Sequence, residues 1–251
     1  MRPGAEVSLL VPTGYFDRAG DVICRIAGAR SEGDAVRLLY EASRCVGADA
    51  AMFCTLVQDV PTHVRFLLAC DPHWYLEHER CSASAADPWI HYAAQCSEPV
   101  CASSFPATTS EQLQALDRAR RYGFESMFIV PSPSAGAAAQ LGVLLLGSRT
   151  PGFFESRSNA AVRVMARSLS MELHAWRLSQ ARQELIQRAQ LTTTDIDLLR
   201  HERKGFGTKQ IARHMHMSGP AIDSRFQRLN ARLGVPSRKA AASLAATYGL
   251  V

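Results

Sequence analysis

Apolar residues in the last quarter of the chain recur at the spacing of a helix that buries one face. Four of them stand at i, i+4, i+7 and i+11 and share that face: Ile222, Phe226, Leu229 and Leu233. Ahead of this stripe, Ser218 is a candidate N-cap, and Pro220 suits the first turn, where a missing N–H costs nothing. Gly234 stands where helices commonly end. The pattern therefore predicts a helix over residues 219–233 with its other face turned to solvent.

Shorter helices are predicted on both sides of this one. The threonine- and acid-rich run 191–199 is typical of a helix N-terminus. Another helix starts at Thr208, and a tight turn through 217–219 joins it to the helix 219–233. A closing helix is expected over 237–247. Helix, tight turn and helix in this order are typical of a DNA-reading motif.

The predicted solvent face of the helix 219–233 is small and polar near its start and basic further along. The face could simply be solvated, but its neighbours favour insertion of this slim, basic helix into the major groove of DNA. We expect four basic residues to contact mainly the phosphate backbone: Lys209, Arg213, Arg225 and Arg232. Three others are candidates to contact base edges: Ser224, Gln227 and Arg228.

Charge is distributed unevenly along the chain. Residues 191–251 hold ten Lys and Arg against four acids, a balance of +6, whereas the whole chain of 251 residues carries only +5. The first 190 residues therefore hold the remaining 18 basic and 19 acidic groups, a balance of −1. A positive balance confined to the last quarter indicates a surface for a phosphate backbone.

The first 177 residues mix strand and helix patterns. Five short apolar runs predict strands, at 48–57, 64–70, 99–103, 128–131 and 141–147. Helical patterns lie before, between and after them, at 17–27, 32–46, 109–122 and 156–177. We predict an α/β domain over 1–177, with an antiparallel sheet flanked by helices. A polar linker, 178–190, leads to an all-α helix-turn-helix domain, 191–251.

The composition of the chain bears on its cellular location and on the state of its cysteines. No apolar run approaches the length that spans a bilayer, and the N-terminus lacks a signal-peptide pattern, so we expect a cytoplasmic protein. All seven cysteines lie in the first 101 residues, with no C-x-x-C pair. This spacing argues against a zinc site or a disulfide framework and predicts reduced, mostly buried thiols.

Motifs for catalysis are absent from the sequence. It contains no G-x-S-x-G, no G-x-G-x-x-G and no P-loop lysine. His214 and His216 stand at i and i+2, on different faces of a helix, which does not suit a zinc site. A thiol beside a histidine occurs at Cys70 with His73 and at Cys81 with His78, although sequence neighbours rarely form such sites. We therefore expect no enzyme, no catalytic residue, no metal and no required cofactor.

The last sixty or so residues resemble a known family. The motifs L-T-x-x-[acid]-x-[acid]-x-L, T-K-x-I-A, A-I-x-x-R and R-L-G-V-x-S-R, in this order and spacing, are similar to the C-terminal domain of LuxR-type transcriptional regulators. The resemblance implies binding to double-stranded DNA at a two-fold operator, with a homodimer covering the two half-sites. Asp223 and Arg225 depart from the commoner pattern, so the operator of a relative cannot be transferred to this chain.

The N-terminal half resembles the N-acyl-homoserine-lactone-binding, or autoinducer-binding, domain of the same quorum-sensing regulators. The motifs are Pro72-His-Trp74-x-x-x-His78, Asp87-Pro88 and Tyr122-Gly-Phe-x-Ser-Met127-x-Ile-x-Pro131. The resemblance implies that the Trp74 indole donates to a lactone carbonyl and that Asp87 accepts from the amide of the signal. From the residues alone, the favoured interpretation is that Trp74 is a core aromatic and Asp87 an N-cap before Pro88. The candidate ligand-binding residues are Trp74, His78, Asp87, Trp89 and Met127.

Three departures alter this pocket. His78 replaces a family tyrosine, Cys101 or Ala102 stands where a tryptophan is expected, and Met127 replaces a glycine. An aromatic wall is lost and a flexible thioether is added, so the ligand is either a homoserine lactone or another small apolar signal. Alternatively, the pocket is filled by its own side chains, and the domain 1–177 serves only dimerisation or partner binding.

Overall fold

The computed structural model describes residues 15–57, 60–74, 76, 88–105, 109–133, 140–156 and 160–251. The chain divides into two compact units, with the boundary between His174 and Ala175 inside one long helix. This boundary lies three residues before the end of the predicted N-terminal domain. The two units are described separately.

A five-stranded sheet organises the first unit. Its strands are β1 (Ala50–Val57), β2 (Val60–Ala69), β3 (Val100–Cys101), β4 (Ser126–Pro133) and β5 (Gln140–Ser148). They lie in the order β2-β1-β5-β4-β3, and the pairs β1/β2, β3/β4 and β4/β5 are antiparallel. The predicted fold class, an antiparallel sheet flanked by helices, is confirmed. The order of the strands could not be read from the sequence.

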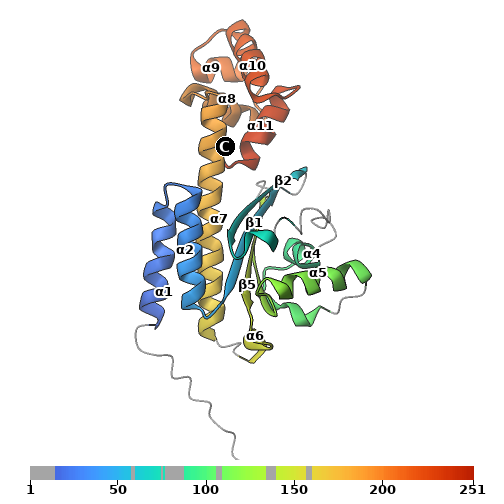
Figure 1. Ribbon diagram of the computed structural model, residues 1–251. Coiled ribbons are helices and arrows are strands. Elements are labelled where there is room, and N and C mark those ends of the chain that lie inside the picture. Colours follow the sequence, from blue (N-terminus) through green and yellow to red (C-terminus); the bar gives the residue numbers. More distant parts are fainter. Residues whose placement is uncertain are drawn as a thin grey trace, which may run out of the picture. The chain divides into compact units, whose positions relative to one another are not determined.

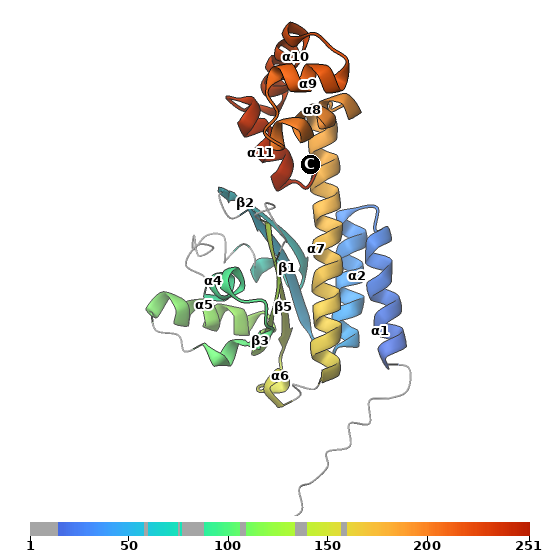
Figure 2. The same ribbon diagram turned by 180° about the vertical axis from the view of Figure 1, so that it is seen from behind.

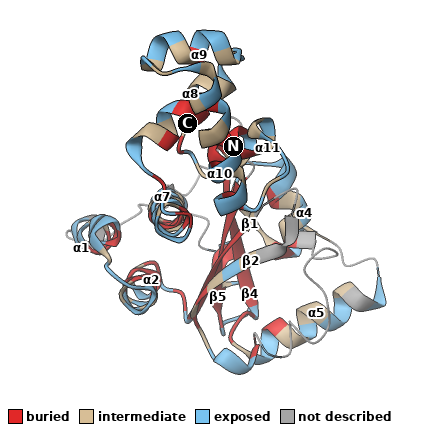
Figure 3. Ribbon diagram, turned by 90° about the horizontal axis from the view of Figure 1, so that it is seen from above, coloured by how far each residue is buried: buried red, intermediate tan, exposed pale blue. Residues whose placement is uncertain are grey.

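Helices cover both faces of the sheet (Figures 1 and 2). One face is covered by α1 (Tyr15–Cys24), α2 (Glu32–Cys45) and the first part of α7 (Ala160–Arg188). The other is covered by α4 (Pro88–Gln95) and α5 (Ser110–Arg121). Shorter elements are the 3₁₀ helices Arg25–Gly28 and Ala102–Ser104 and the one-turn helix α6 (Phe153–Ser156). Seen from above, the strands form a buried layer between the two groups of helices (Figure 3).

Successive side chains along each strand point to opposite faces of the sheet, so both faces carry apolar residues that pack against helices. Met52, Ile129 and Val143 pack into the cluster beneath α4 and α5, and their strand neighbours point to the opposite face. On that opposite face, a Cβ at Gly142 would lie 2.6 Å from the Nδ1 atom of His174, so only glycine lets α7 approach β5 this closely. Ser170 of α7 hydrogen-bonds to the sheet there, donating to the Val130 carbonyl at 3.0 Å.

The six cysteines in the described part of the chain are all free thiols. Only Cys54 is buried, whereas Cys24 and Cys96 are exposed. The prediction of mostly buried thiols is therefore wrong. Single cysteines on helix surfaces carry no periodicity signal that would separate them from core positions.

Helix α7 extends further than the sequence pattern suggested. The predicted helix ended at residue 177, but α7 runs without a break from Ala160 to Arg188, through most of the segment 178–190. This segment has no proline or glycine and is rich in Gln, Arg, Ala and Leu, which favour a helix. Leu185 and Ala189 are buried in the core of the second unit.

The second unit is a small helical domain. It contains α8 (Thr193–Arg203), α9 (Thr208–Met215), α10 (Gly219–Leu233) and α11 (Arg238–Thr247). Its core joins one apolar face from each helix, including Leu198 and Leu199 of α8, Ile211 of α9 and Ala241 of α11. The described helices include none that is both long and apolar enough to cross a bilayer.

Candidate nucleic-acid interface and ligand site

The segment α9–turn–α10 forms the predicted helix-turn-helix. At the end of α9, His216 adopts the left-handed conformation with φ 54°, which turns the chain toward α10. The Ser218 hydroxyl then caps α10, accepting from the Ala221 amide at 3.3 Å, and Pro220 occupies the first turn. Gly234 ends α10 with φ 68°, a conformation that suits glycine.

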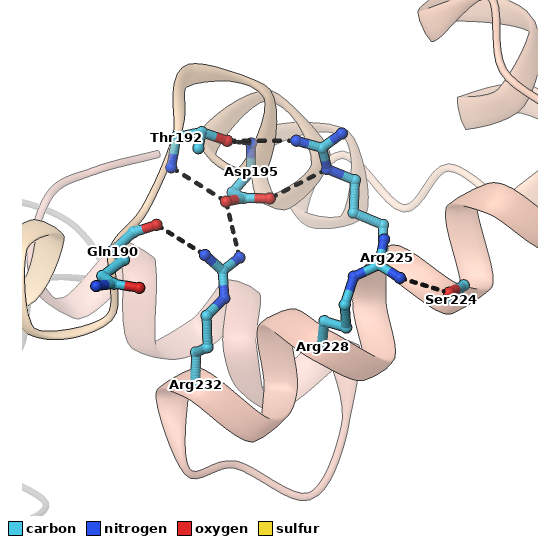
Figure 4. A network of polar contacts seen from close by, with 7 residues as sticks. All are labelled: Gln190, Thr192, Asp195, Ser224, Arg225, Arg228 and Arg232. Atoms are coloured by element: carbon cyan, nitrogen blue, oxygen red, sulfur yellow. Dashed lines mark hydrogen bonds and ion pairs between the residues drawn. The ribbon is translucent and has the colours of Figure 1, made fainter.

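The predicted stripe of α10 faces the core. All four of its members are buried: Ile222, Phe226, Leu229 and Leu233. This orientation leaves Gln227 and Arg228 exposed and Ser224 half-buried on the other side. Arg228 donates from NH1 to the Ser224 hydroxyl at 2.9 Å, so these two candidates for base contact lie together one turn apart (Figure 4).

Two of the predicted phosphate contacts lie on α9. Lys209 and Arg213 are exposed, and within the described residues neither forms a hydrogen bond or ion pair. Their ammonium and guanidinium groups are therefore available to an external anion. Long flexible cations of this kind suit contacts to a phosphate backbone.

The other two predicted phosphate contacts, Arg225 and Arg232 of α10, are engaged inside the domain (Figure 4). Both pair with Asp195 in the first turn of α8, whose side chain is only 2% exposed. Arg225 Nε lies 3.2 Å from Oδ1, and Arg232 NH2 lies 2.8 Å from Oδ2. Arg232 also donates from NH1 to the Gln190 carbonyl at 2.7 Å. The two arginines thereby tie α10 to the start of α8.

Asp195 is held as a carboxylate by these donors. Burial by itself would raise the pKa of Asp195, but hydrogen bonds from Arg232, from Thr192 and from Arg225 outweigh it and lower the pKa to about 2. Asp195 also completes the capping box of α8, accepting from the Thr192 amide at 3.1 Å. One buried charge thus serves the helix cap and both arginines.

Asp223, the unusual acid on α10, also has a partner within the domain. Its Oδ1 accepts from the Thr208 hydroxyl at 3.2 Å, and the same hydroxyl accepts from Arg238 at 2.9 Å. Arg238 Nε lies 3.1 Å from Glu202 Oε2. These contacts connect α8, α9, α10 and α11, so the acid reinforces the packing of the motif.

Sequence analysis missed Asp195 as the centre of this network. The first-turn acid was visible as a helix-start signal, but its arginine partners lie 30 and 37 residues further along. A helix-start signal says nothing about such distant contacts. The one available signal was the pair of arginines, 225 and 232, at i and i+7 on the predicted helix, which places them on one face.

The candidate ligand site in the first unit is a packed aromatic cluster. Trp74 and Trp89 are 1% and 2% exposed, and Met127 is 2% exposed in the same apolar cluster. The ring of Trp74 lies 5.0 Å from that of Phe124. Two other candidates, His78 and Asp87, the predicted acceptor for the amide of the signal, lie outside the described residues. The structure therefore brings together the apolar part of the predicted set.

Hollows in the described surface are lined by other residues. One, of about 720 Å³, lies between α1 and α2 and is lined mainly by charged side chains such as Arg18, Arg25 and Arg44. Another, of about 500 Å³, adjoins Tyr40 and Cys70. Neither includes Trp74, Trp89 or Met127 in its lining.

The Cys70 and His73 pair lacks the features of an activated nucleophile. Burial, together with the charge of Asp71, raises the pKa of Cys70 to about 12, so the thiol stays protonated at neutral pH. His73 instead contacts Asp71, with 2.8 Å between Nδ1 and Oδ1. Cys81 lies outside the described residues. Within them, no group of three His, Cys, Asp or Glu side chains is placed to hold a metal ion.

Solved structures share this fold along the chain. Escherichia coli SdiA matches 94% of this chain and 98% of its own, with a TM-score of 0.70 and 15% identity. SdiA in complex with octanoyl-rac-glycerol matches 100% and 98%, also with a TM-score of 0.70, at 14% identity. CepR2 of Burkholderia cenocepacia, an N-acylhomoserine-lactone-dependent LuxR family transcription factor, matches 66% and 96%, with a TM-score of 0.56 and 18% identity. The chain has the fold of a LuxR family regulator.

This likeness confirms, at the level of the fold, the resemblance that the sequence motifs carry. No family model matches the sequence, and no curated relative matches it. The SdiA matches span the sheet domain and the helical domain together.

Proposed function

We propose that the protein is a DNA-binding transcriptional regulator of the quorum-sensing type, acting as a homodimer in the cytoplasm. In this proposal α10 enters the major groove of a two-fold operator. Lys209 and Arg213 contact phosphates, and Gln227 and Arg228 contact base edges, with Ser224 holding Arg228 in position. Arg225 and Arg232 contribute mainly by fixing the direction of α10.

The observation that carries this proposal is that the different faces of α10 make different contacts. Its apolar stripe faces the core, and Arg225 and Arg232 are paired with Asp195 inside the domain. The opposite side of the helix leaves Gln227 and Arg228 exposed. The unengaged cations of α9 flank the same motif. A rigid helix with one free polar face suits readout of base edges in the major groove.

We further propose that the first unit binds a small apolar signal, either an acyl-homoserine lactone or another molecule of similar chemistry. The cluster around Trp74, Trp89 and Met127 supplies apolar surface for an acyl chain. Asp87 and His78 supply polar partners for a head group. The signal would act by favouring one of two pre-existing arrangements of the protein.

One observation favours a second candidate, a regulator that needs no ligand. Trp74 and Met127 are almost completely buried and share one cluster with Phe124. Side chains packed in this way suit a pocket that is filled by the protein itself. The first unit would then serve only dimerisation or partner binding.

Thermal unfolding against acyl-homoserine lactones of graded chain length separates the two candidates. A ligand that binds only the folded state at ~100 times its Kd adds about 2.7 kcal/mol to the free energy of unfolding. The signal proposal predicts a shift that depends on chain length and is lost in Asp87→Ala but kept in the surface control Asp17→Ala. A shift with host-cell extract alone indicates a different small molecule. No shift in a protein that still binds DNA supports the ligand-independent candidate.

A further inference from the structure

Lysine is confined to one part of the chain. The first 190 residues contain none, and the three lysines of the protein, Lys204, Lys209 and Lys239, all lie in the helical domain. All three are exposed, and within the described residues none of their ammonium groups forms a hydrogen bond or ion pair. A flexible, unengaged point charge of this kind suits a contact with phosphate.

Arg238 fixes the start of α11, next to Lys239. Its NH1 group donates to the Thr208 hydroxyl at 2.9 Å, and its Nε atom lies 3.1 Å from Glu202 Oε2. Its guanidinium carbon lies 5.8 Å from the centre of the Phe226 ring. Arg238 therefore contacts α8, α9 and α10, and the first turn of α11 has a fixed place beside them.

These contacts place Lys239 near Lys209. Lys209 directly follows Thr208, and Lys239 directly follows Arg238, so each lysine adjoins one member of a hydrogen-bonded pair. The Ser237 hydroxyl caps α11, so the backbone that carries Lys239 belongs to a formed first turn. We call Lys209 and Lys239 the lysine pair.

The lysine pair lies beside the start of α10. The Thr208 hydroxyl donates to Asp223, early in α10, at 3.2 Å. A Cβ at Gly219, the first residue of α10, would lie 3.7 Å from the Thr208 methyl carbon. This end of α10 is the one that reads bases in the proposed function. The pair is therefore continuous with the surface assigned to DNA, which favours duplex DNA over an acidic protein as its partner.

Neither member of the lysine pair stabilises its own helix. Lys209 and Lys239 each stand in the first turn of a helix, where the partial positive charge of the helix end opposes a cation. Two acids on the neighbouring helices, Glu202 and Asp223, have other partners. The two lysines thus carry a local cost in stability, which a contact with phosphate would offset.

We propose that Lys239 of α11 is a further phosphate contact of the DNA-binding unit, beside Lys209 of α9. This inference rests on the proposed function and extends it, because it brings α11 into contact with DNA. Each half-site is then held by a phosphate contact from α11 in addition to those from α9. The contact raises affinity for every duplex and leaves the preference among sequences unchanged.

The dependence of DNA binding on salt tests this contact. The full chain is titrated with duplexes that it selects and with unrelated duplexes, by fluorescence anisotropy over a series of salt concentrations. Lys239→Gln should bind all of them about fivefold more weakly per half-site. The slope of log Kd against log salt concentration should fall by about 0.9 per half-site, because one phosphate contact is lost. Lys239→Arg keeps the charge and should retain the slope.

Lys204→Gln is the matched control. Lys204 is an exposed lysine of the same domain and stands two residues after Glu202, at the end of α8. Positions two apart on a helix do not share a face, so Lys204 is turned away from the side of α8 that contacts Arg238. Its substitution should change neither the affinity nor the slope. Unchanged thermal unfolding of each variant shows that it has folded.

Two results would overturn the inference. One is a Lys239→Gln variant that keeps the affinity and the slope of the original chain, as expected if this surface meets an acidic protein instead. The other is a Lys204→Gln variant whose slope falls as much as that of Lys239→Gln. In both cases, binding of selected duplexes by the unaltered chain leaves the proposed function intact. If the unaltered chain binds no duplex at all, the proposed function fails as well.

Discussion

At the scale of single residues, the buried carboxylate of Asp195 does most to fix the candidate interface. Its two oxygens accept from both arginines of α10, while its backbone belongs to the first turn of α8. A buried ion pair adds little net stability over an apolar pair, but the loss of one partner leaves the other charges unpaired. Asp195 therefore acts as a positioning residue for α10.

Asp195→Asn should destabilise the second unit by about 2–4 kcal/mol, because Arg225 and Arg232 lose their shared partner. Hydrogen exchange of the α10 amides is the measurement, since it reports on this unit alone. Asp197→Asn is the control, because Asp197 is exposed and, among the described residues, forms its ion pair with Arg200 on its own helix. Equal protection of α10 in the two variants would show that the network does not position the helix.

His174 makes the first unit sensitive to acid. Burial lowers the pKa of His174 to about 4, from an ordinary value of 6.5. Since the unfolded chain binds this proton more readily, stability is complete above about pH 6.5 and falls by about 3 kcal/mol toward pH 4. Urea unfolding followed by tryptophan fluorescence at several pH values measures this loss.

His174→Leu removes the titrating group and should flatten the pH dependence in this window, even if the variant is less stable throughout. Comparing how steeply the free energy of unfolding changes with pH in the two proteins separates the contribution of His174 from that of the carboxylates, which titrate mainly at lower pH. A variant whose stability falls as steeply as that of the original chain would show that another group is responsible.

At the scale of elements, α10 was the most predictable part of the fold. Its cap residue, its proline, its apolar stripe and its terminal glycine are all local signals, and the structure realises each of them. The strands were also visible as apolar runs, since each is short and bounded by turn residues. Their order in the sheet was not, because β1 and β5 are neighbours although about eighty residues separate them.

The candidate sites were predictable only in part, for a related reason. The exposed face of α10 follows from periodicity, so Gln227 and Arg228 could be chosen from the sequence. The engagement of Arg225 and Arg232 depends on a distant carboxylate, and periodicity carries no information about it. Trp74, Trp89 and Met127 were grouped by resemblance, and the fold brings them into one cluster.

Helix α7 gives a test at this scale. Leu185 is 3% exposed in the core of the second unit, so Leu185→Ala should lower the stability of that unit by about 2–4 kcal/mol. Gln187→Ala, two residues away and exposed, is the control and should have little effect. If neither substitution changes hydrogen exchange in α8 to α11, residues 178–190 behave as a simple linker.

At the scale of the whole molecule, the two units differ in net charge. The excess of positive charge lies in the helical domain, whereas the first 190 residues are close to neutral. Such a division concentrates attraction to DNA in the part of the chain that carries the helix-turn-helix.

Sequence-specific DNA binding by α10 is the most direct test of the proposed function. Duplexes selected by the protein from a random library would be measured by fluorescence anisotropy, together with variants altered at one base pair at a time. We predict a two-fold symmetric site, with half-sites about 10 base pairs apart. Arg228→Ala should cost about 1–3 kcal/mol and relax discrimination at one position of each half-site, whereas Lys209→Ala should weaken all duplexes equally. A protein that selects no sequence, or that binds every duplex alike with Arg228 intact, would contradict the account.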